Sequence, residues 1–438
     1  MEANTPLKKN DLQVSDIEAV KVIKAFYPLT LLRRMYLSAT LFASKGLIDL
    51  AASGAFYFFL SIIPIVLLVV YVLDISIAGY GKLSDYFFYL LAQFNPQISR
   101  GFFEEIGLLN SEKKSFFGII GVIGLIWSSR SVFNGIRSTF DLIFSGDSKR
   151  GFLKDNLISL IFVPMVVAAC ITVFIVVVVV KNLAMLFEKF GVPYFASASA
   201  MGIYSNIIIA VIIFFTSYLF YRFLPSNKPD GSDVVPGAAL FALSAFILQK
   251  GLYGVITMAS YYLVYGIIST LIVGLFWVYI LFALFYFFAQ FVYVQHMYSE
   301  LEFNTFYINM SGYGNFIEKQ LFKRPDTVIL RFGRHLKAGE TVYLQGDEAK
   351  AFYILLSGQI KTVKKNELGN EKVTTVNPNE TFGESGALSK SFYDRTAIAE
   401  TDAEVIEIPK SFYEKTSSLD PKVQQIMLKS YLHRMEEG

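Results

Sequence analysis

Long runs without a charged residue are the feature of this sequence that most constrains its fold. Gly251–Gln295 is 45 residues long and contains no Asp, Glu, Lys or Arg. Leu50–Leu73 and Asn156–Val180 are further charge-free runs. As helices, such runs are long enough to cross a bilayer core of about 30 Å. Only helices and closed barrels satisfy every backbone polar group in lipid, and uninterrupted apolar runs are typical of helices. The sequence therefore predicts an α-helical, polytopic membrane domain.

Dividing these runs into segments of spanning length predicts six transmembrane helices. The region after the Pro225–Gly237 loop is too long for one span, so we divide it into spans near 235–256 and 267–294. The second span begins at Phe116 and has to continue past Arg130 in order to cross. The other three spans are predicted at Leu50–Leu73, Asn156–Val180 and Gly191–Tyr221.

The loops between these spans differ in their content of Lys and Arg. The segment before the first span holds seven and the loop after the second holds five, whereas loops 74–115 and 181–202 hold four and two. Basic loops remain on the cytoplasmic side, so both termini are expected in the cytoplasm of a bacterial cell, with the spans in its inner membrane. No signal peptide is expected, because the first apolar run begins at residue 50.

The charged residues of the chain are concentrated in its last quarter. Residues 323–438 hold 17 basic and 17 acidic residues, against 22 and 19 in all the rest, which indicates a soluble domain without net charge. Short alternating segments separated by glycines are typical of an all-β sandwich or barrel. Strands are predicted at Thr341–Leu344, Phe352–Leu356, Gln359–Val363, Val373–Val376, Ala397–Ala399 and Glu404–Ile408. A helical tail follows from Ser411 to Met435, with a break at Leu419–Asp420–Pro421.

The predicted fold is thus a six-helix membrane domain plus a C-terminal all-β jelly roll, or β-roll, with flanking helices. The basic excess lies in the membrane part, so no nucleic-acid partner is expected. The single cysteine excludes an intramolecular disulfide. The predicted domains are cytoplasmic or interfacial N-terminal helices at 1–46, the membrane domain at 47–298, a linker at 299–324 and the β-roll domain at 325–438.

A polar stripe runs off the cytoplasmic end of the second span. Arg130, Asn134, Arg137 and Asp141 are spaced by 4, 3 and 4 residues, which places them on one helical face. Lys250 lies in or near the fifth span. Polar residues within spans are candidates for a functional role, so the stripe predicts a polar cavity open to the cytoplasm. For any one residue, anchoring by a snorkelling side chain is the simpler interpretation.

The membrane part resembles the YihY/BrkB family of membrane proteins over roughly residues 25–300. The resemblance rests on Ala51–Pro64 (AASGAFYFFLSIIP), on Trp127–Arg130 followed by Asn134, and on Leu224-Pro225, Pro236-Gly237 and Tyr265-Gly266 in that order. It implies six spans in the cytoplasmic membrane and little about chemistry. Some members carry an old ribonuclease label. The three histidines here do not pair with carboxylates at metal-ligand spacing, so no enzyme, metal or cofactor is expected.

The most informative stretch of the C-terminal domain is Phe382–Leu388 (FGESGAL), which is followed by Arg395-Thr396. Glycines permit a close approach of the backbone to a ligand, and the N–H groups at a helix start attract an anion. An arginine pairs with phosphate, and a carboxylate accepts a hydrogen bond from a ribose 2′-hydroxyl. The candidate nucleotide-binding residues are Gly383, Glu384, Ser385, Gly386, Ala387, Leu388, Arg395 and Thr396.

These residues resemble the phosphate-binding cassette of the cyclic-nucleotide-binding domain family, over about residues 325–435. The resemblance implies cyclic AMP or cyclic GMP as a regulatory ligand, with Glu384 on the ribose, Arg395 on the phosphate and Thr396 on phosphate or base. The C-terminal helix would be the mobile lid. Asp394 stands where the family often has proline, and it would compete with phosphate for Arg395. The alternative is a β-roll that no longer binds nucleotide and serves in docking or oligomerisation.

Together these features predict a membrane transporter or permease for a small or amphiphilic solute, controlled by a cyclic nucleotide. A non-transporting membrane scaffold or sensor is the first alternative, and a nuclease is disfavoured. A cation channel is disfavoured, because Gly79-Tyr80-Gly81 and Gly312-Tyr313-Gly314 lie outside the interval between the last two spans, where a filter would be. The expected partners are the lipid bilayer, the nucleotide and the unknown solute, and self-association is left open.

Overall fold

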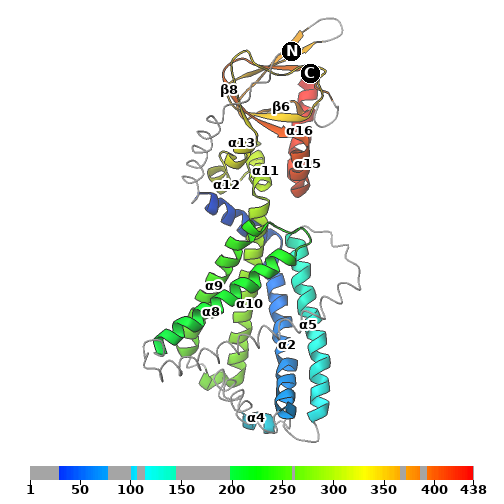
Figure 1. Cartoon of the computed structure of the whole chain (residues 1–438). Coiled ribbons are helices and arrows are strands. Elements are labelled where there is room, and N and C mark those ends of the chain that lie inside the picture. Colours follow the sequence, from blue (N-terminus) through cyan, green and yellow to red (C-terminus); the bar gives the residue numbers. More distant parts are fainter. Residues whose placement is uncertain are drawn as a thin grey trace, which may run out of the picture. The chain divides into compact units, whose positions relative to one another are not determined.

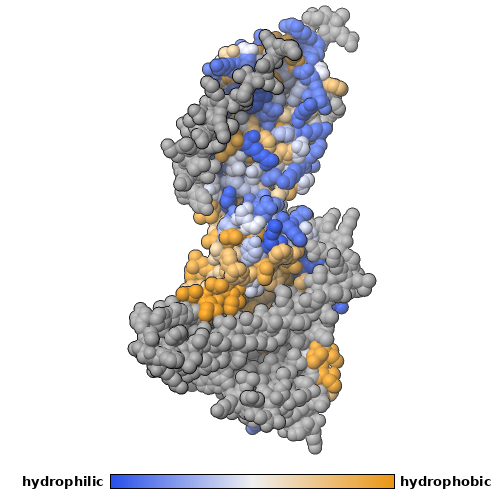
Figure 2. All heavy atoms as spheres, in the orientation of Figure 1, coloured by the Kyte–Doolittle hydropathy of each residue, from blue (hydrophilic) through white to orange (hydrophobic). Residues whose placement is uncertain are grey.

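The computed structural model describes residues 29–76, 100–105, 114–144, 198–258, 262–365, 371–384 and 392–437. These residues belong to two compact units. The membrane unit is Ser38–His296, and the β-roll unit combines the N-terminal segment up to Leu37 with Met297–Gly438. Of the described atoms visible in Figure 2, hydrophobic ones gather on the membrane unit and hydrophilic ones on the β-roll unit.

Long helices make up the described part of the membrane unit. Helix α2 packs against α5 and α10, whereas α9 packs against α8 and α10 (Figure 1). A Cβ atom at Gly237 would overlap the Val292 side chain, so this glycine permits the close approach of α9 to α10. The helices are α2 (Leu47–Ser76), α4 (Arg100–Glu105), α5 (Lys114–Ile143), α8 (Ala198–Phe223), α9 (Gly231–Met258) and α10 (Tyr262–His296).

Aromatic side chains fill the interior of the membrane unit. Tyr221 of α8 stacks on Phe140 of α5 and on Phe285 of α10, Phe140 and Phe285 are tilted relative to each other, and the three ring centroids lie 5.2 to 6.1 Å apart. The Tyr221 hydroxyl is buried and donates to the Phe285 carbonyl at 2.9 Å. Because that polar tip is satisfied, a tyrosine is tolerated in this aromatic core.

Three or four helices of the described residues are long and apolar enough to cross a membrane. Three are single stretches, Asn206–Phe223, Gly231–Gly251 and Ile272–His296. Leu29–Ser44 and Leu47–Ile62, which are bent by 70° relative to each other, make a fourth if the pair is one broken span. The predicted third span, 156–180, lies outside the described residues. Membrane-spanning helices are therefore supported, and the number six stays a prediction.

Two four-stranded antiparallel sheets form the β-roll. Their strand orders are β1-β8-β3-β6 and β2-β7-β4-β5. One core is shared by strands of both sheets and includes Tyr343, Leu355, Phe382 and Val405. The strands are β1 (Gly333–Leu336), β2 (Thr341–Tyr343), β3 (Ala351–Ser357), β4 (Ile360–Lys365), β5 (Glu371–Val376), β6 (Thr381–Phe382), β7 (Thr396–Ala399) and β8 (Ala403–Pro409).

Helices cover the other face of the first sheet. Side chains alternate along a strand, so Tyr353 of β3 enters the core between the sheets whereas Phe352 and Ile354 enter a second core. Phe303 and Phe412 join that second core from two of the helices. The helices of this unit are α11 (Tyr298–Met310), α12 (Phe316–Leu321), α13 (Asp326–Phe332), α15 (Lys410–Leu419) and α16 (Pro421–Glu437), of which α12 contacts α11 and contributes no residue to the second core.

The predicted all-β domain with flanking helices is confirmed, with three differences. Strands β1 and β6 were not predicted, because β1 carries a polar sequence and β6 has only two residues. The predicted linker at 299–324 instead contains α11 and α12. Composition does not reveal this, because Phe303 and Phe306 become core residues only when α11 packs on the sheet. The predicted break before Pro421 is present, between α15 and α16.

Candidate functional site

The predicted cassette connects the two sheets of the β-roll. Its first part follows β6, in one sheet, and its second part precedes β7, in the other. Gly383 has φ +79°, and a Cβ atom there would lie 3.2 Å from a ring carbon of Tyr393 and 3.3 Å from the Tyr343 hydroxyl. Glycine is therefore required at this turn both for its backbone conformation and for the space available. Residues 385–388 lie outside the described residues.

Glu384 is the buried carboxylate of this site. Only 2% of its surface is exposed, and its Oε1 accepts a hydrogen bond from the Thr381 hydroxyl at 3.2 Å. An ionised carboxylate offers about four lone-pair positions. The Thr381 hydroxyl occupies one of these positions on Glu384.

Arg395 is half-buried and is held by its neighbour. Its Nη2 lies 3.1 Å from Asp394 Oδ2 and its Nε lies 3.3 Å from Oδ1. Burial alone would lower the Arg395 pKa, but the hydrogen bond and charge of Asp394, with the charge of Glu384, raise it overall. The ion pair between Arg395 and Asp394 forms, and its competition with a ligand phosphate, which the sequence predicted, stays a prediction.

Thr396 and Tyr343 lie beside the arginine. The Thr396 Oγ1 accepts from the Gln345 backbone N–H at 3.0 Å, so its own proton is available to a ligand. Tyr343 pairs with Ala397 across β2 and β7, and its hydroxyl interacts electrostatically with both Glu384 and Arg395. The structure thus brings the two predicted ligands together around a tyrosine that sequence reasoning missed. No sequence signal marks this tyrosine, because a core strand commonly holds an aromatic residue.

The polar stripe of the second span lies on α5, as its spacing requires. Arg130 and Asn134 are exposed, whereas Arg137 and Asp141 are half-buried and form an ion pair with Nε and Oδ2 3.8 Å apart. The other carboxylate oxygen of Asp141 accepts from the Ser226 hydroxyl at 3.2 Å. The pair is therefore tied to the loop before α9, and a cavity lined by the stripe stays a prediction.

Lys250, the other predicted cavity residue, lies exposed on α9. Its ammonium nitrogen is 5.4 Å from the centre of the Phe246 ring, one turn earlier on the same helix. An ammonium over an aromatic face gains about 0.5–1 kcal/mol at an exposed site. This contact fits an anchoring lysine as well as a cavity residue.

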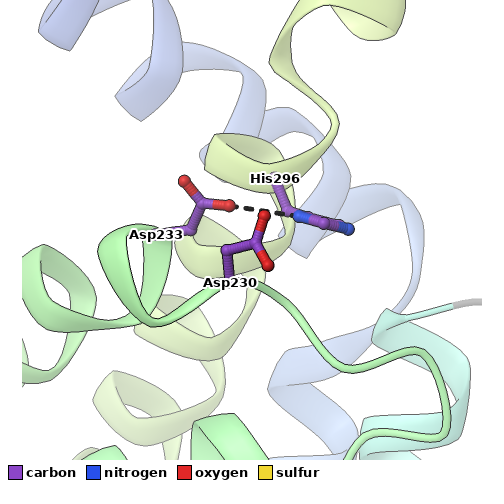
Figure 3. A group of neighbouring side chains, drawn as sticks. All are labelled: Asp230, Asp233 and His296. Carbon is purple, nitrogen blue, oxygen red and sulfur yellow. Dashed lines mark hydrogen bonds and ion pairs between the residues drawn. The ribbon is translucent and has the colours of Figure 1, made fainter.

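Asp230, Asp233 and His296 form a group that the sequence did not suggest (Figure 3). One ligand atom from each lies within 4.8 Å of the others, and His296 Nδ1 is 3.1 Å from Asp233 Oδ2. Imidazole and carboxylate are ligands for zinc and similar divalent ions. Both aspartates also lie at the start of α9, where the partial positive charge of a helix stabilises carboxylates. The group therefore has a structural explanation that does not involve an ion.

Family comparison identifies the membrane part. A family model described as Virulence factor BrkB matches residues 39–303, more than half of the chain. The chain belongs to the BrkB family. The match extends from the residues before α2 to the middle of α11, and so includes all described helices of the membrane unit. This BrkB-family protein is accordingly a membrane protein.

A second family model, Cyclic nucleotide-binding domain, matches residues 333–417 of this BrkB-family protein. That range runs from β1 into α15 and includes Glu384 and Arg395. The protein thus joins a BrkB membrane domain to a cyclic nucleotide-binding domain within one chain.

Curated and solved relatives match only a part of this protein. The transcriptional activator FnrA of Stutzerimonas stutzeri is 32% identical over 102 residues, which are 23% of this chain and 41% of that protein. Lysophospholipase NTE1 of Saccharomyces cerevisiae is 33% identical over 87 residues, 17% of this chain and 5% of that one. The Thermus thermophilus catabolite activator protein has 24% identity and a TM-score of 0.24, and the match covers 26% of this chain and 54% of that chain. The chain spans less than half the length of the curated relatives it matches.

Proposed function

We propose that this BrkB-family protein is regulated by a cyclic nucleotide that binds its C-terminal domain through Glu384 and Arg395. The observation that carries the proposal is the convergence of these two side chains. Glu384 follows β6 of one sheet and Arg395 precedes β7 of the other, yet their charges act on each other and on the same Tyr343 hydroxyl. A cyclic nucleotide presents a ribose hydroxyl and a single anionic phosphodiester on one rigid ring system, and a carboxylate beside a guanidinium is complementary to both.

Binding requires an exchange of partners at Arg395. The guanidinium contacts Asp394 through two of its nitrogens and has to turn at least one of them toward the phosphate. A half-buried ion pair is worth only about 1 kcal/mol when water reaches it. The exchange therefore weakens binding without preventing it. Replacing Asp394 by alanine is expected to tighten binding by about three- to tenfold.

For the membrane domain we propose six spans in the bacterial inner membrane, both termini in the cytoplasm, and movement of a small or amphiphilic solute across the bilayer. Three or four apolar helices and the Arg137–Asp141 pair on α5 support this assignment. Polar pairs are costly in a bilayer and are commonly retained where they line a pathway. We assign the protein no catalytic step, and we propose the nucleotide as its regulatory ligand rather than as a cofactor.

Equilibrium dialysis of the purified full-length protein in detergent against tritiated cyclic AMP and cyclic GMP tests nucleotide binding. Arg395→Ala removes a charge-assisted contact and should raise Kd by roughly 10- to 100-fold. Glu384→Ala should weaken cyclic AMP but leave its 2′-deoxy analogue nearly unaffected. Arg334→Ala is the matched control, because this arginine is exposed and pairs with Glu407 on the outside of the domain. Linear 5′-AMP should compete poorly.

The outcome also discriminates between the two membrane functions. If neither nucleotide binds wild-type protein at millimolar concentration, the domain is a degenerate β-roll and the scaffold function replaces the regulated one. If a nucleotide binds, flux of candidate solutes into proteoliposomes with and without that nucleotide tests transport. Binding without any nucleotide-dependent flux would favour a sensor that reports nucleotide concentration to a partner.

A further inference from the structure

The hydroxyl group of Tyr343 is buried without a hydrogen-bond partner among the residues that the structure describes. Only 6% of the residue is exposed. Buried hydroxyl groups are nearly always hydrogen-bonded, because a missing bond costs about 1–3 kcal/mol. Phenylalanine would fill the same space without that cost. The unpaired hydroxyl therefore requires an explanation beyond packing.

The ring of Tyr343 is fixed by its neighbours. It stacks on Tyr393 with centroids 3.8 Å apart and an interplanar angle of 14°, and it also stacks on Tyr353 at 5.6 Å. Backbone pairing of β2 with β7 fixes the register of Tyr343, which lies opposite Ala397. The hydroxyl is consequently held 3.3 Å from where a Cβ atom of Gly383, the second residue of the stretch Phe382–Leu388, would be. The equivalent hydroxyl of Tyr393 is satisfied, since it donates to the Ala351 carbonyl at 2.7 Å.

Burial keeps the Tyr343 hydroxyl protonated. Burial raises the pKa of Tyr343 well above its ordinary value, and the negative charge of Glu384 raises it further. A neutral phenol is a hydrogen-bond donor. The desolvation of this donor and the orientation of its ring are already complete before any ligand arrives, so a ligand acceptor gains the bond at little additional cost.

We propose that the Tyr343 hydroxyl donates a hydrogen bond to the phosphodiester of the bound cyclic nucleotide, beside Arg395. This inference rests on the proposed nucleotide site and adds a residue to it. A phosphate is an acceptor only and needs several donors, and Arg395 is partly engaged by Asp394. The ribose hydroxyl already has an acceptor in Glu384. The unused Tyr343 hydroxyl therefore stabilises the anionic phosphate more than it would stabilise the ribose.

Tyr343→Phe tests the proposal, because it removes one oxygen and keeps the ring stack. The full-length protein is dialysed against tritiated cyclic AMP, and its unfolding is measured separately without ligand. Loss of a hydrogen bond to a charged acceptor should raise Kd by roughly 10- to 100-fold. The ligand-free variant should be as stable as wild type or more stable, because an unsatisfied buried hydroxyl has been removed. A purely structural role predicts no change in Kd.

Tyr393→Phe is the control, since it modifies the other ring of the same stack. That variant loses the bond to Ala351 and should be less stable, with Kd within about twofold of wild type. If both variants weaken binding equally, packing explains the effect and the proposal is wrong. If Tyr343→Phe binds as tightly as wild type, the proposal is wrong and the proposed function is unaffected. If wild-type protein does not bind, both are overturned.

The 2′-deoxy analogue of cyclic AMP locates the acceptor. For a phosphate contact, Tyr343→Phe should weaken the analogue by the same factor as cyclic AMP, because independent contacts contribute additively. If the substitution has no effect on the analogue, the hydroxyl contacts the ribose 2′-oxygen, and the phosphate assignment is overturned.

Discussion

Replacing Arg33 should loosen the helices that flank the β-roll. Arg33 lies on the helix Leu29–Ser44, and its Nη1 contacts Glu302 Oε1 of α11 at 3.1 Å and Asp326 Oδ2 of α13 at 2.8 Å. The side chain of Arg33 is 5% exposed and that of Glu302 is fully buried. These three residues, which we call the Arg33 clasp, join segments 269 and 293 residues apart in the sequence.

The free-energy cost of removing Arg33 depends on the hydration and the hydrogen bonds that each carboxylate keeps. Asp326 is partly exposed and can be hydrated, so it contributes little to the cost. Glu302 keeps a hydrogen bond from the Tyr298 hydroxyl at 3.3 Å and one from the Thr327 backbone N–H at 2.9 Å. Breaking a buried ion pair from one side costs about 3–5 kcal/mol, and the two remaining donors favour the lower end, about 3 kcal/mol.

Hydrogen exchange measured by mass spectrometry on the full-length protein provides the assay. A loss of 3 kcal/mol should accelerate exchange of the α11 and α13 amides about 100-fold, since 1.4 kcal/mol corresponds to a factor of ten. Arg334→Ala breaks an exposed pair and should change exchange by less than about fivefold. Substituting methionine at both Arg33 and Glu302 should recover much of the protection.

An exchange rate for Arg33→Ala within threefold of wild type, or equal to that of Arg334→Ala, would refute the reasoning. Such a result would mean that water reaches Glu302, and that the clasp is energetically an exposed ion pair. The test also concerns regulation, because the helix that carries Arg33 continues past Leu37 into the membrane unit. All three residues of the clasp belong to the β-roll unit, and the helix that carries Arg33 is the chain segment that leads from this unit into the membrane unit.

Three further predictions concern packing, pH and topology. Gly237→Ala should destabilise the membrane unit by about 1–3 kcal/mol, because its Cβ would overlap α10, whereas Gly251→Ala on the same helix meets no atom within 4 Å and should be neutral or stabilising in thermal unfolding. Burial raises the pKa of Glu302, so its contribution to stability is complete below its ordinary pKa of 4.5 and is lost as pH rises through the raised value. The unfolding temperature of Glu302→Gln should therefore rise relative to that of wild type as the pH increases above 4.5. A cysteine at Ser84 should be labelled from outside intact cells, whereas cysteines in 340–430 should not; labelling of the latter would reverse the proposed orientation.

Much of the proposed nucleotide site was predictable, because its candidate residues are close in sequence. Glu384 and Arg395 were found from the spacing of glycines, a carboxylate and an arginine, and adjacency to Asp394 was enough to predict the ion pair that forms. Tyr343 was not found. Its role depends on an unpaired hydroxyl, and whether a hydroxyl is paired depends on atoms from β2, β6 and β7 together.

The Arg33 clasp was missed for a related reason. Arg33 was counted only as one of seven basic residues before the first span, and Glu302 was placed in a linker. Neither residue has a local signal, because both partners of Arg33 are more than 250 residues away in the sequence. The His296–Asp233 contact, 63 residues apart, is a smaller case of the same kind.

The hydropathy of the chain is enough to establish a membrane part and a soluble β-rich domain, because burial of apolar surface and pairing of backbone polar groups depend on composition averaged over many residues. Alternation along β3 likewise determines which side chains face each core. Polar contacts between distant segments are different. Each depends on angstrom-scale placement of two side chains, and that placement exists only after the sheets and helices have packed. The folded chain alone therefore shows that Arg33 clamps α11 to α13, and that the Tyr343 hydroxyl is buried beside Gly383 without a partner.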